Sequence, residues 1–184
     1  MTQMERRHRR VREMTYIALA AVLMAACSWI SIPSAIPFTL QTFGVFLTTG
    51  LLGGRCGTIA VCLYILLGAV GVPVFSGFSG GVGELLGPTG GYILGFVLSA
   101  LLMWGIRARF GRGTVALVFS MAAGLIACYA FGTAWFMVVY ARNSGAVGLG
   151  AALSWCVVPF VLPDCAKIAL ATLLTRRLEG HVKL

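Results

Sequence analysis

The length of its uncharged stretches limits what this chain can fold into more than any other feature. Residues 14–54, 56–83, 85–106, 113–141 and 143–163 contain no Asp, Glu, Lys or Arg. A helix needs about 20 mostly apolar residues to cross the hydrocarbon core of a bilayer. Hydrophobic residues make up 59% of the chain and charged residues only 10%, which is too little charge to cover the surface of a soluble domain. The sequence therefore predicts an integral membrane protein surrounded by the lipid bilayer.

Six crossings fit these stretches. The first stretch is long enough for two spans, and Pro33 and Pro37 supply the break between them. We expect an all-α membrane domain over residues 14–178, with a basic segment at 1–13 before it and a short tail at 179–184 after it. The predicted spans lie near 14–32, 39–54, 56–72, 90–107, 114–140 and 151–177.

The basic residues predict the orientation of the spans. With six spans, twelve of the fourteen Lys and Arg residues fall on the side of the two termini, whereas Arg142 lies on the opposite side and Lys167 inside the last span. Basic residues accumulate in cytoplasmic loops, so we expect a multi-pass cell-membrane protein with both termini in the cytoplasm. Because the basic clusters are short and separated by apolar runs, the net charge of +9 indicates topology rather than nucleic-acid binding.

Asp164 and Lys167 are the charged residues that the sequence places inside a span. Each costs about 2.5–3.5 kcal/mol to insert at mid-helix, so such residues are usually functional. Their spacing of three residues puts both on one helix face, and Pro159 and Pro163 are expected to break the helix just before it. The pair either grips a polar ligand, with Asp164 as acceptor and Lys167 as donor, or forms a structural ion pair. A proton relay is a third possibility, although it usually needs a chain of titratable groups.

Two segments on the outer side are irregular. Residues 71–91 are rich in glycine and join the third and fourth spans, and residues 33–43 join the first and second. Glycine-rich backbone at membrane depth is tolerated where it is buried in protein or lines a cavity. The glycine-rich segment is therefore either a flexible outer loop or a lid over a ligand site.

Other motifs are less specific. Ala21 and Ala25 form an AxxxA pattern, which lets a second helix approach closely, whether from the same chain or from a partner. The six cysteines form no CxxC pair, and both histidines lie in the basic ends, so we expect no metal site and no cofactor. The chain lacks the GxxxxGK[ST] and HExxH motifs, which favours a protein that is not an enzyme and has no nucleotide site of its own.

Three stretches of the chain resemble a known family. They are residues 36–77, which begin IPFTLQTF, residues 80–96, GGVGELLGPTGGYILGF, and residues 159–171, PFVLPDCAKIALA. The combination of PFTLQT, LGPTGGY and DxxK resembles the BioY family, the biotin-specific substrate-binding (S) components of energy-coupling factor (ECF) transporters. The resemblance runs from about Ala18 to Arg177.

The resemblance implies a six-helix S-component bundle that binds biotin near the outer face, under the loop between the third and fourth spans. It implies that Ala21 and Ala25 meet a transmembrane coupling subunit, which carries two ATPase subunits. Ser79 stands where some members have asparagine, and Glu84 stands where others have a small residue. The biotin contacts that we expect are Asp164, Lys167, Tyr92, Phe38, Gln41, Ser79, Gly80 and Trp135.

Biotin suits these residues chemically. Its ureido ring carries two N–H donors and a carbonyl, its thiophane ring is apolar, and its tail ends in a carboxylate. We expect Asp164 to accept from the ureido N–H groups and Lys167 to lie near a ligand oxygen. The alternative function is an ion-coupled secondary carrier for a small organic solute, which would usually show inverted repeats that we do not find in the sequence.

Overall fold

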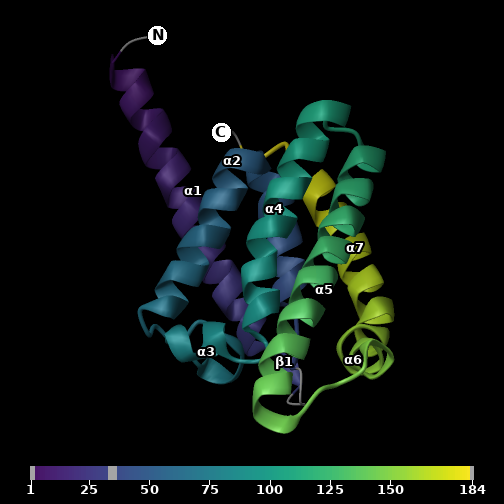
Figure 1. The fold of residues 1–184 in the computed structure, drawn as a ribbon. Helices are drawn as coiled ribbons and strands as arrows, with labels where there is room; N and C mark the ends of the chain where they lie inside the picture. Colours follow the sequence, from purple (N-terminus) through teal and green to yellow (C-terminus); the bar gives the residue numbers. More distant parts are fainter. Residues whose placement is uncertain (1–2, 33–36, 183–184) are drawn as a thin grey trace.

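A computed structural model describes residues 3–32 and 37–182 of the chain. Figure 1 shows a bundle of long helices, with α1 starting and α7 ending at one end and α3, α6 and β1 at the other. The elements, in chain order, are α1 (Gln3–Trp29), β1 (Ser31–Ile32), β2 (Phe38–Thr39), α2 (Gln41–Ala69), η1 (Ser76–Phe78), α3 (Val82–Leu86), α4 (Gly90–Phe110), α5 (Thr114–Ser144), α6 (Leu149–Cys156) and α7 (Val158–Leu178).

The helix α2 is a hairpin of two antiparallel arms rather than one straight rod. Gly53 has φ 75° and ψ 175°, a conformation that is essentially restricted to glycine, and the chain reverses there. The side-chain amide of Gln41 donates to the hydroxyl of Tyr64 at 2.7 Å. In a straight helix, 23 residues of separation would place these two residues about 34 Å apart. The predicted spans 39–54 and 56–72 are therefore the two arms.

Five helices of the described chain are long and apolar enough to cross a membrane, namely α1, α2, α4, α5 and α7. Because α2 doubles back, they provide the all-helical membrane architecture that the sequence predicts. The last predicted span, 151–177, was too long at its start, since the helix breaks at Val157 (φ −123°, ψ −56°) into α6 and α7. Pro159 occupies the first turn of α7, where proline is tolerated, whereas Pro163 lies inside α7 without ending it.

The outer segments contain more structure than the sequence predicts. Ser31 pairs with Thr39, and Ile32 with Phe38, in a short antiparallel ribbon. The proposed break at Pro33 lies outside the described residues. The glycine-rich segment 71–91 holds the turn η1 and the short helix α3 instead of a structureless loop.

The face of α1 that carries the AxxxA pattern is covered by the chain itself. Ala21 and Ala25 are 2% and 4% exposed, and they belong to the same core cluster as Val61 and Tyr64 of α2. Small residues here allow α1 and α2 to pack closely. The expectation that these two alanines meet a coupling subunit therefore finds no open surface in this structure, because α2 already occupies it.

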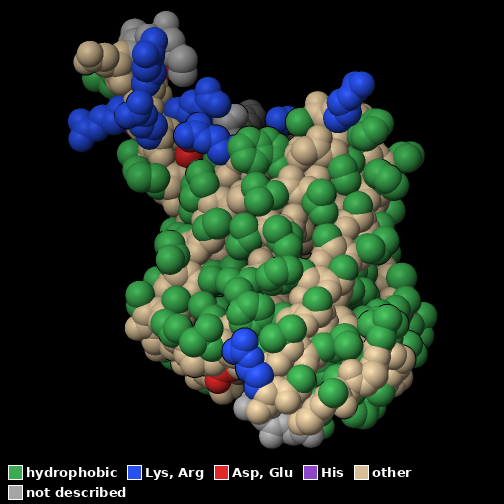
Figure 2. Space-filling model, viewed as in Figure 1, with side chains coloured by type: hydrophobic (Ala, Val, Ile, Leu, Met, Phe, Trp, Pro, Cys, Tyr) green, Lys and Arg blue, Asp and Glu red, His purple; other side chains and the backbone are tan. Residues whose placement is uncertain are grey.

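Charged side chains are distributed unevenly along the bundle. Figure 2 shows that most of the Lys and Arg side chains on the visible face gather at the end where α1 begins. The helix α4 ends where α1 begins (Figure 1), so this end includes exposed Arg10 and Arg12 on α1, and exposed Arg109 and Arg112 at the end of α4 and just after it. On the visible face, the side chains between the two ends are mostly hydrophobic, as a lipid-facing surface requires.

Candidate functional site

A cavity lies at the end of the bundle opposite to the start of α1. Its empty volume is about 780 Å³, a figure that includes the part open to solvent. Residues from α2, the segment 75–89, α4, α5, α6 and α7 contribute to the wall. The lining residues are Pro37, Thr39, Gln41, Thr42, Phe75, Ser76, Ser79, Glu84, Thr89, Tyr92, Ile93, Phe96, Cys128, Tyr129, Cys156, Phe160, Asp164 and Lys167.

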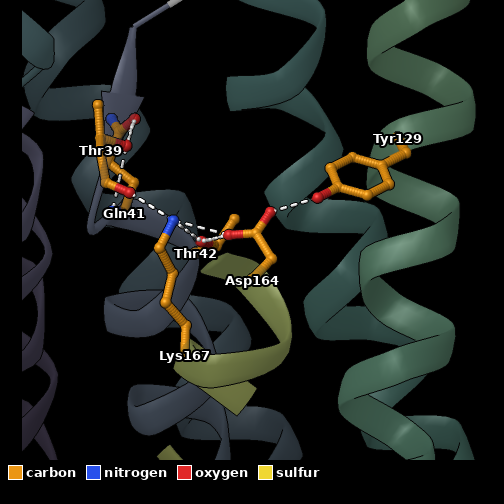
Figure 3. Close-up of polar contacts among 6 residues, drawn as sticks. All are labelled: Thr39, Gln41, Thr42, Tyr129, Asp164 and Lys167. Atoms are coloured by element: carbon orange, nitrogen blue, oxygen red, sulfur yellow. Dashed lines mark hydrogen bonds and ion pairs between the residues drawn. The ribbon is translucent and has the colours of Figure 1, made fainter. Parts of the chain in front are cut away.

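Asp164 and Lys167 form a buried ion pair on the wall of this cavity. The ammonium Nζ of Lys167 lies 2.7 Å from the carboxylate Oδ1 of Asp164, and the two residues are 6% and 2% exposed. Their i, i+3 spacing on α7 places both on the inward face, as the sequence predicts. Figure 3 shows the two side chains meeting between α7 and the start of α2.

The hydrogen bonds of Lys167 are all taken by protein atoms. Besides Asp164, its ammonium donates to the main-chain carbonyl of Thr39 at 2.6 Å and to the hydroxyl of Thr42 at 3.2 Å. An ammonium has three N–H donors, so these three bonds use its full capacity. The ring of Phe38 lies 4.3 Å from Nζ, close enough for a cation–π contact. Lys167 is therefore held rigidly.

The hydrogen bonds of the protein use only part of the acceptor capacity of the Asp164 carboxylate. Oδ1 accepts from Lys167 and from the hydroxyl of Thr42 at 3.0 Å, whereas Oδ2 accepts from the hydroxyl of Tyr129 on α5. Figure 3 shows Tyr129 reaching Asp164 from the side opposite to Lys167. A carboxylate offers about four acceptor positions, and three are used. Within the part of the chain that the structure describes, one acceptor position on Oδ2 thus remains for a ligand donor.

A second chain of hydrogen bonds connects the cavity wall to the glycine-rich segment 71–91, which also lines the cavity. The hydroxyl of Thr39 donates to Gln41 Oε1 at 3.0 Å, and Gln41 donates to Tyr64. Tyr64 in turn donates to the carbonyl of Val74 at 3.1 Å, and Ser28 at the end of α1 lies within hydrogen-bonding distance of the same carbonyl. This buried chain fixes the base of the glycine-rich segment.

Aromatic rings hold the same segment in place. Phe75 is 1% exposed and meets Tyr64 edge-on, with ring centroids 5.6 Å apart. A methyl group on Gly68 would lie 2.0 Å from the Phe75 ring, so only glycine at that position leaves room for it. Phe78, the one described non-glycine residue with positive φ, stacks on Trp29 at 5.0 Å. The segment is thus anchored at buried Phe75, whereas Phe78 and Trp29 stack at the surface.

The structure brings together most of the predicted ligand residues. Asp164, Lys167, Gln41, Tyr92 and Ser79 all line the cavity. Tyr92 is held there because its hydroxyl and that of Thr133 share a hydrogen bond of 2.9 Å, and because its ring packs tightly on Gly132.

Three predicted residues do not line the cavity. Phe38 lies behind the cavity wall, where its ring contacts the ammonium of Lys167 and stacks on the ring of Phe160, with ring centroids 6.0 Å apart. Trp135 points to the loop before α4, where its indole N–H donates to the carbonyl of Gly87 at 3.0 Å. A methyl on Gly80 would meet the Val72 carbonyl at 2.4 Å, which indicates that Gly80 serves backbone packing.

Several lining residues were missed by the sequence analysis. Tyr129 and Thr42 complete the hydrogen bonds of Asp164, and Cys128, Cys156 and Phe160 supply apolar wall. Thr42 follows Gln41 in the PFTLQT motif and could have been found from it. Tyr129 could not, since it is one aromatic residue among many in an uncharged span.

Residues 77–81 match the GxSxG pattern of hydrolase nucleophiles, but the geometry does not. That motif needs a strand-to-helix turn and a nearby histidine. Here Ser79 follows the turn η1, and its hydroxyl donates to the carbonyl of Ser76 at 2.9 Å. The histidines, His8 and His181, lie at the other end of the bundle, in α1 and just beyond α7. Ser79 is therefore a wall residue of the cavity.

Comparison with known proteins identifies the family. The model of the BioY family matches residues 1–183. The chain belongs to the BioY family. This membership confirms the resemblance seen in the three sequence stretches, which contribute Gln41, Tyr92, Asp164 and Lys167 to the cavity.

Individual relatives agree with this membership. The chain is 40% identical to the biotin transporter BioY of Thermotoga maritima over 92% of its own length and 96% of the relative's. It is 38% identical to the probable biotin transporter BioY of Pyrococcus horikoshii, over 94% of this chain and 99% of that protein. A crystal structure of the S component for biotin from an ECF-type ABC transporter matches with a TM-score of 0.84 and 26% identity, covering 98% and 95% of the two chains. The predicted S-component fold is confirmed.

Proposed function

We propose that this chain binds biotin as the S component of an ECF-type ABC transporter and that it takes part in biotin uptake across the cell membrane. The observation that carries the proposal is the cavity itself, in which a buried carboxylate with one open acceptor position stands on an otherwise largely apolar wall. The names of the BioY relatives and of the similar crystal structure give the same substrate.

Asp164 is the residue that we assign to the ureido ring of biotin. Its open acceptor position on Oδ2 suits a ureido N–H, and a charge-assisted hydrogen bond of this kind is about twice as strong as a neutral one. Lys167 has no free N–H in this structure, so we assign it to holding Asp164 charged and correctly oriented. A ligand oxygen would reach Lys167 only by replacing Thr39 or Thr42.

The remaining wall suits the apolar body of biotin. Phe96, Ile93 and Phe160 offer apolar contacts, and Gln41 and Tyr92 offer polar groups nearby. Burial of apolar ligand surface supplies most of the binding free energy in sites of this kind, while a few placed polar groups set the orientation.

ATP-driven uptake requires partners. The chain has no P-loop, so hydrolysis must come from other subunits, and we propose a transmembrane coupling subunit with two ATPases. Ala21 and Ala25 are left out of the docking surface because α2 covers them.

We also propose that both termini face the cytoplasm, which places the cavity at the outer surface. The support is the concentration of arginine at the end of the bundle where α1 begins. A periplasmic-type reporter fused after Leu184 should stay inactive, and a cytoplasmic-type reporter should be active. Activity of the periplasmic-type reporter outside the cell would contradict this orientation.

Calorimetry on the purified chain in detergent, without any ion gradient, tests the biotin assignment. Saturable one-to-one binding of biotin is expected, and dethiobiotin or lipoate should bind more weakly because each lacks part of the bicyclic ring. Binding that appears only with an added sodium or proton gradient would support an ion-coupled carrier instead.

A further inference from the structure

Two aromatic rings stack on the outside of the glycine-rich segment 71–91. Trp29, the last residue of α1, and Phe78 of η1 have ring centroids 5.0 Å apart and ring planes 21° apart. The two residues are 40% and 64% exposed. The indole N–H is the only polar group of the Trp29 side chain, and it is satisfied inside the protein because it donates to the carbonyl of Pro73 at 2.9 Å. The pair therefore presents apolar ring surface to its surroundings.

The backbone directs Phe78 away from the cavity. Its φ of 58° lies in the left-handed region, which bulky residues seldom adopt. Ser76 and Ser79, on either side of it, line the cavity, whereas the ring of Phe78 lies against Trp29. The segment thus has two faces at this point, with serine side chains towards the cavity and an aromatic ring on the outside.

The apolar surface continues beyond the two rings. Val70 and Val82 are also exposed, and the main-chain N–H of Gly81 donates to the carbonyl of Gly68 at 2.6 Å, so the stretches that contain the two valines lie side by side. Residues 56–83 include no Asp, Glu, Lys or Arg. Exposed apolar side chains that gather in this way mark a surface that contacts a membrane or another protein.

The depth of the ring pair decides between these two kinds of contact. Glu13 is the last charged residue of α1, and the helix rises about 24 Å from Glu13 to Trp29. A tilt of α1 only shortens the rise across the membrane, and the hydrocarbon core is about 30 Å thick. With Glu13 at one boundary of the core, Trp29 and the Phe78 ring stacked on it lie about 6 Å short of the opposite boundary. Tryptophan is enriched at this level of membrane proteins.

We propose that phospholipid acyl chains, in the part close to the headgroups, cover the outer face of the glycine-rich segment. The residues of this lipid-contact face are Trp29, Val70, Phe78 and Val82. The segment then separates the cavity from the bilayer, with its serine side chains on the cavity side and the ring of Phe78 on the lipid side. The contact requires neither a particular ligand in the cavity nor a particular orientation of the chain in the membrane.

Fluorescence quenching of Trp29 in lipid nanodiscs tests the proposal. The signal of Trp29 is the difference between the wild type and Trp29→Phe, which removes one of the four tryptophans and keeps a ring that can stack on Phe78. Phospholipids that carry bromine near the headgroup end of the acyl chain should quench this difference signal strongly. Phospholipids with bromine near the chain end should quench it less, and iodide, which stays in the water, should quench it least.

Two variants of Phe78 show whether the apolar surface holds the segment against the lipid. Phe78→Asp introduces a charge that is costly in an apolar environment, so the signal of Trp29 should lose quenching by brominated lipid and gain quenching by iodide. Phe78→Leu is the matched control, because it keeps an apolar side chain on the same backbone, and it should retain the wild-type pattern. The comparison of wild type with Trp29→Phe does not require that Phe78→Asp folds.

Three results of that comparison would overturn the proposal. Quenching of the Trp29 signal by iodide and by neither brominated lipid would show that the face lies in water. Protection from iodide and from both brominated lipids would show that protein covers it, for example a second copy of the chain. Stronger quenching by bromine at the chain end than by bromine near the headgroup would place the rings near the bilayer centre.

Discussion

The ammonium of Lys167 lies 2.6 Å from the main-chain carbonyl of Thr39, on the strand that leads into α2. This bond ties α7 to the start of the helical hairpin, more than 120 residues earlier in the sequence. The same ammonium neutralises Asp164, so one side chain serves both the packing of the bundle and the electrostatics of the cavity.

Replacement of Lys167 should destabilise the protein strongly. Lys167→Met leaves Asp164 buried and charged without a cation, which costs about 3–5 kcal/mol. Combining it with Asp164→Asn removes the uncompensated charge and should restore much of the thermal stability in detergent. As a control, Arg176→Met removes one partner of a half-exposed pair with Glu179, worth at most about 1 kcal/mol. If Lys167→Met and Arg176→Met lose the same stability, the structural role of Lys167 is contradicted.

Replacement of Asp164 should weaken biotin binding, and it should also lower stability because Lys167 is left as a buried cation without its carboxylate. Asp164→Asn keeps the shape of the side chain but removes the charge-assisted acceptor, worth about 1.5–3 kcal/mol, so Kd should rise roughly tenfold to 150-fold. The measurement is calorimetric titration of wild type, the single variants and the double variant Asp164→Asn/Lys167→Met. Affinity near wild type in a folded double variant would show that the pair is structural only.

The turn in α2 should depend on the glycine at its apex. Gly53→Ala places a side chain at φ 75°, ψ 175°, where the backbone strain is about 1–3 kcal/mol, although no neighbouring atom lies within 4 Å of the new methyl group. The melting temperature should fall. Gly105→Ala, in α4 and also free of close neighbours, should instead leave stability unchanged or raise it, because alanine favours the helix. An unchanged melting temperature for both variants would show that the turn tolerates other residues.

The tip of the glycine-rich segment 71–91, residues 76–86, should respond to ligand, whereas the residues at its base should not. Phe75 and the Val74 carbonyl are fixed by buried contacts, whereas Val82 and Leu86 are exposed. Hydrogen exchange of residues 76–86 should slow with saturating biotin, and that of residues 64–75 should stay slow throughout. Phe75→Ala should make exchange in both parts fast. If exchange of the tip is the same with and without biotin, the segment is not a lid.

The sequence analysis predicted the parts of this fold that depend on charge and length. Uncharged runs located the membrane segments, and the pair of Asp164 and Lys167 stood out because charge in a span is costly. The two arms of α2 were separated correctly since Arg55 lies close to the turn, even though the turn itself is at Gly53.

The parts that were missed depend on contacts between distant segments. Tyr129 reaches Asp164 from α5, and nothing in its local sequence distinguishes it from other aromatic residues of that span. Trp135 was expected in the cavity because it is aromatic, yet the direction of its ring is set by the carbonyl of Gly87. The AxxxA pattern predicted a close helix contact, and only the three-dimensional arrangement shows that α2 makes it.

The reversal of α2 leaves its first arm shorter than the hydrocarbon core of a bilayer is thick. The first arm runs from Gln41 to Leu52, so it rises only about 18 Å, whereas the hydrocarbon core of a bilayer is about 30 Å thick. If the turn at Gly53 lies at one boundary of the hydrocarbon core, Gln41 and Thr42 at the start of the arm lie about 12 Å short of the opposite boundary. The polar wall that they contribute to the cavity would then lie within the depth of the core rather than at its surface.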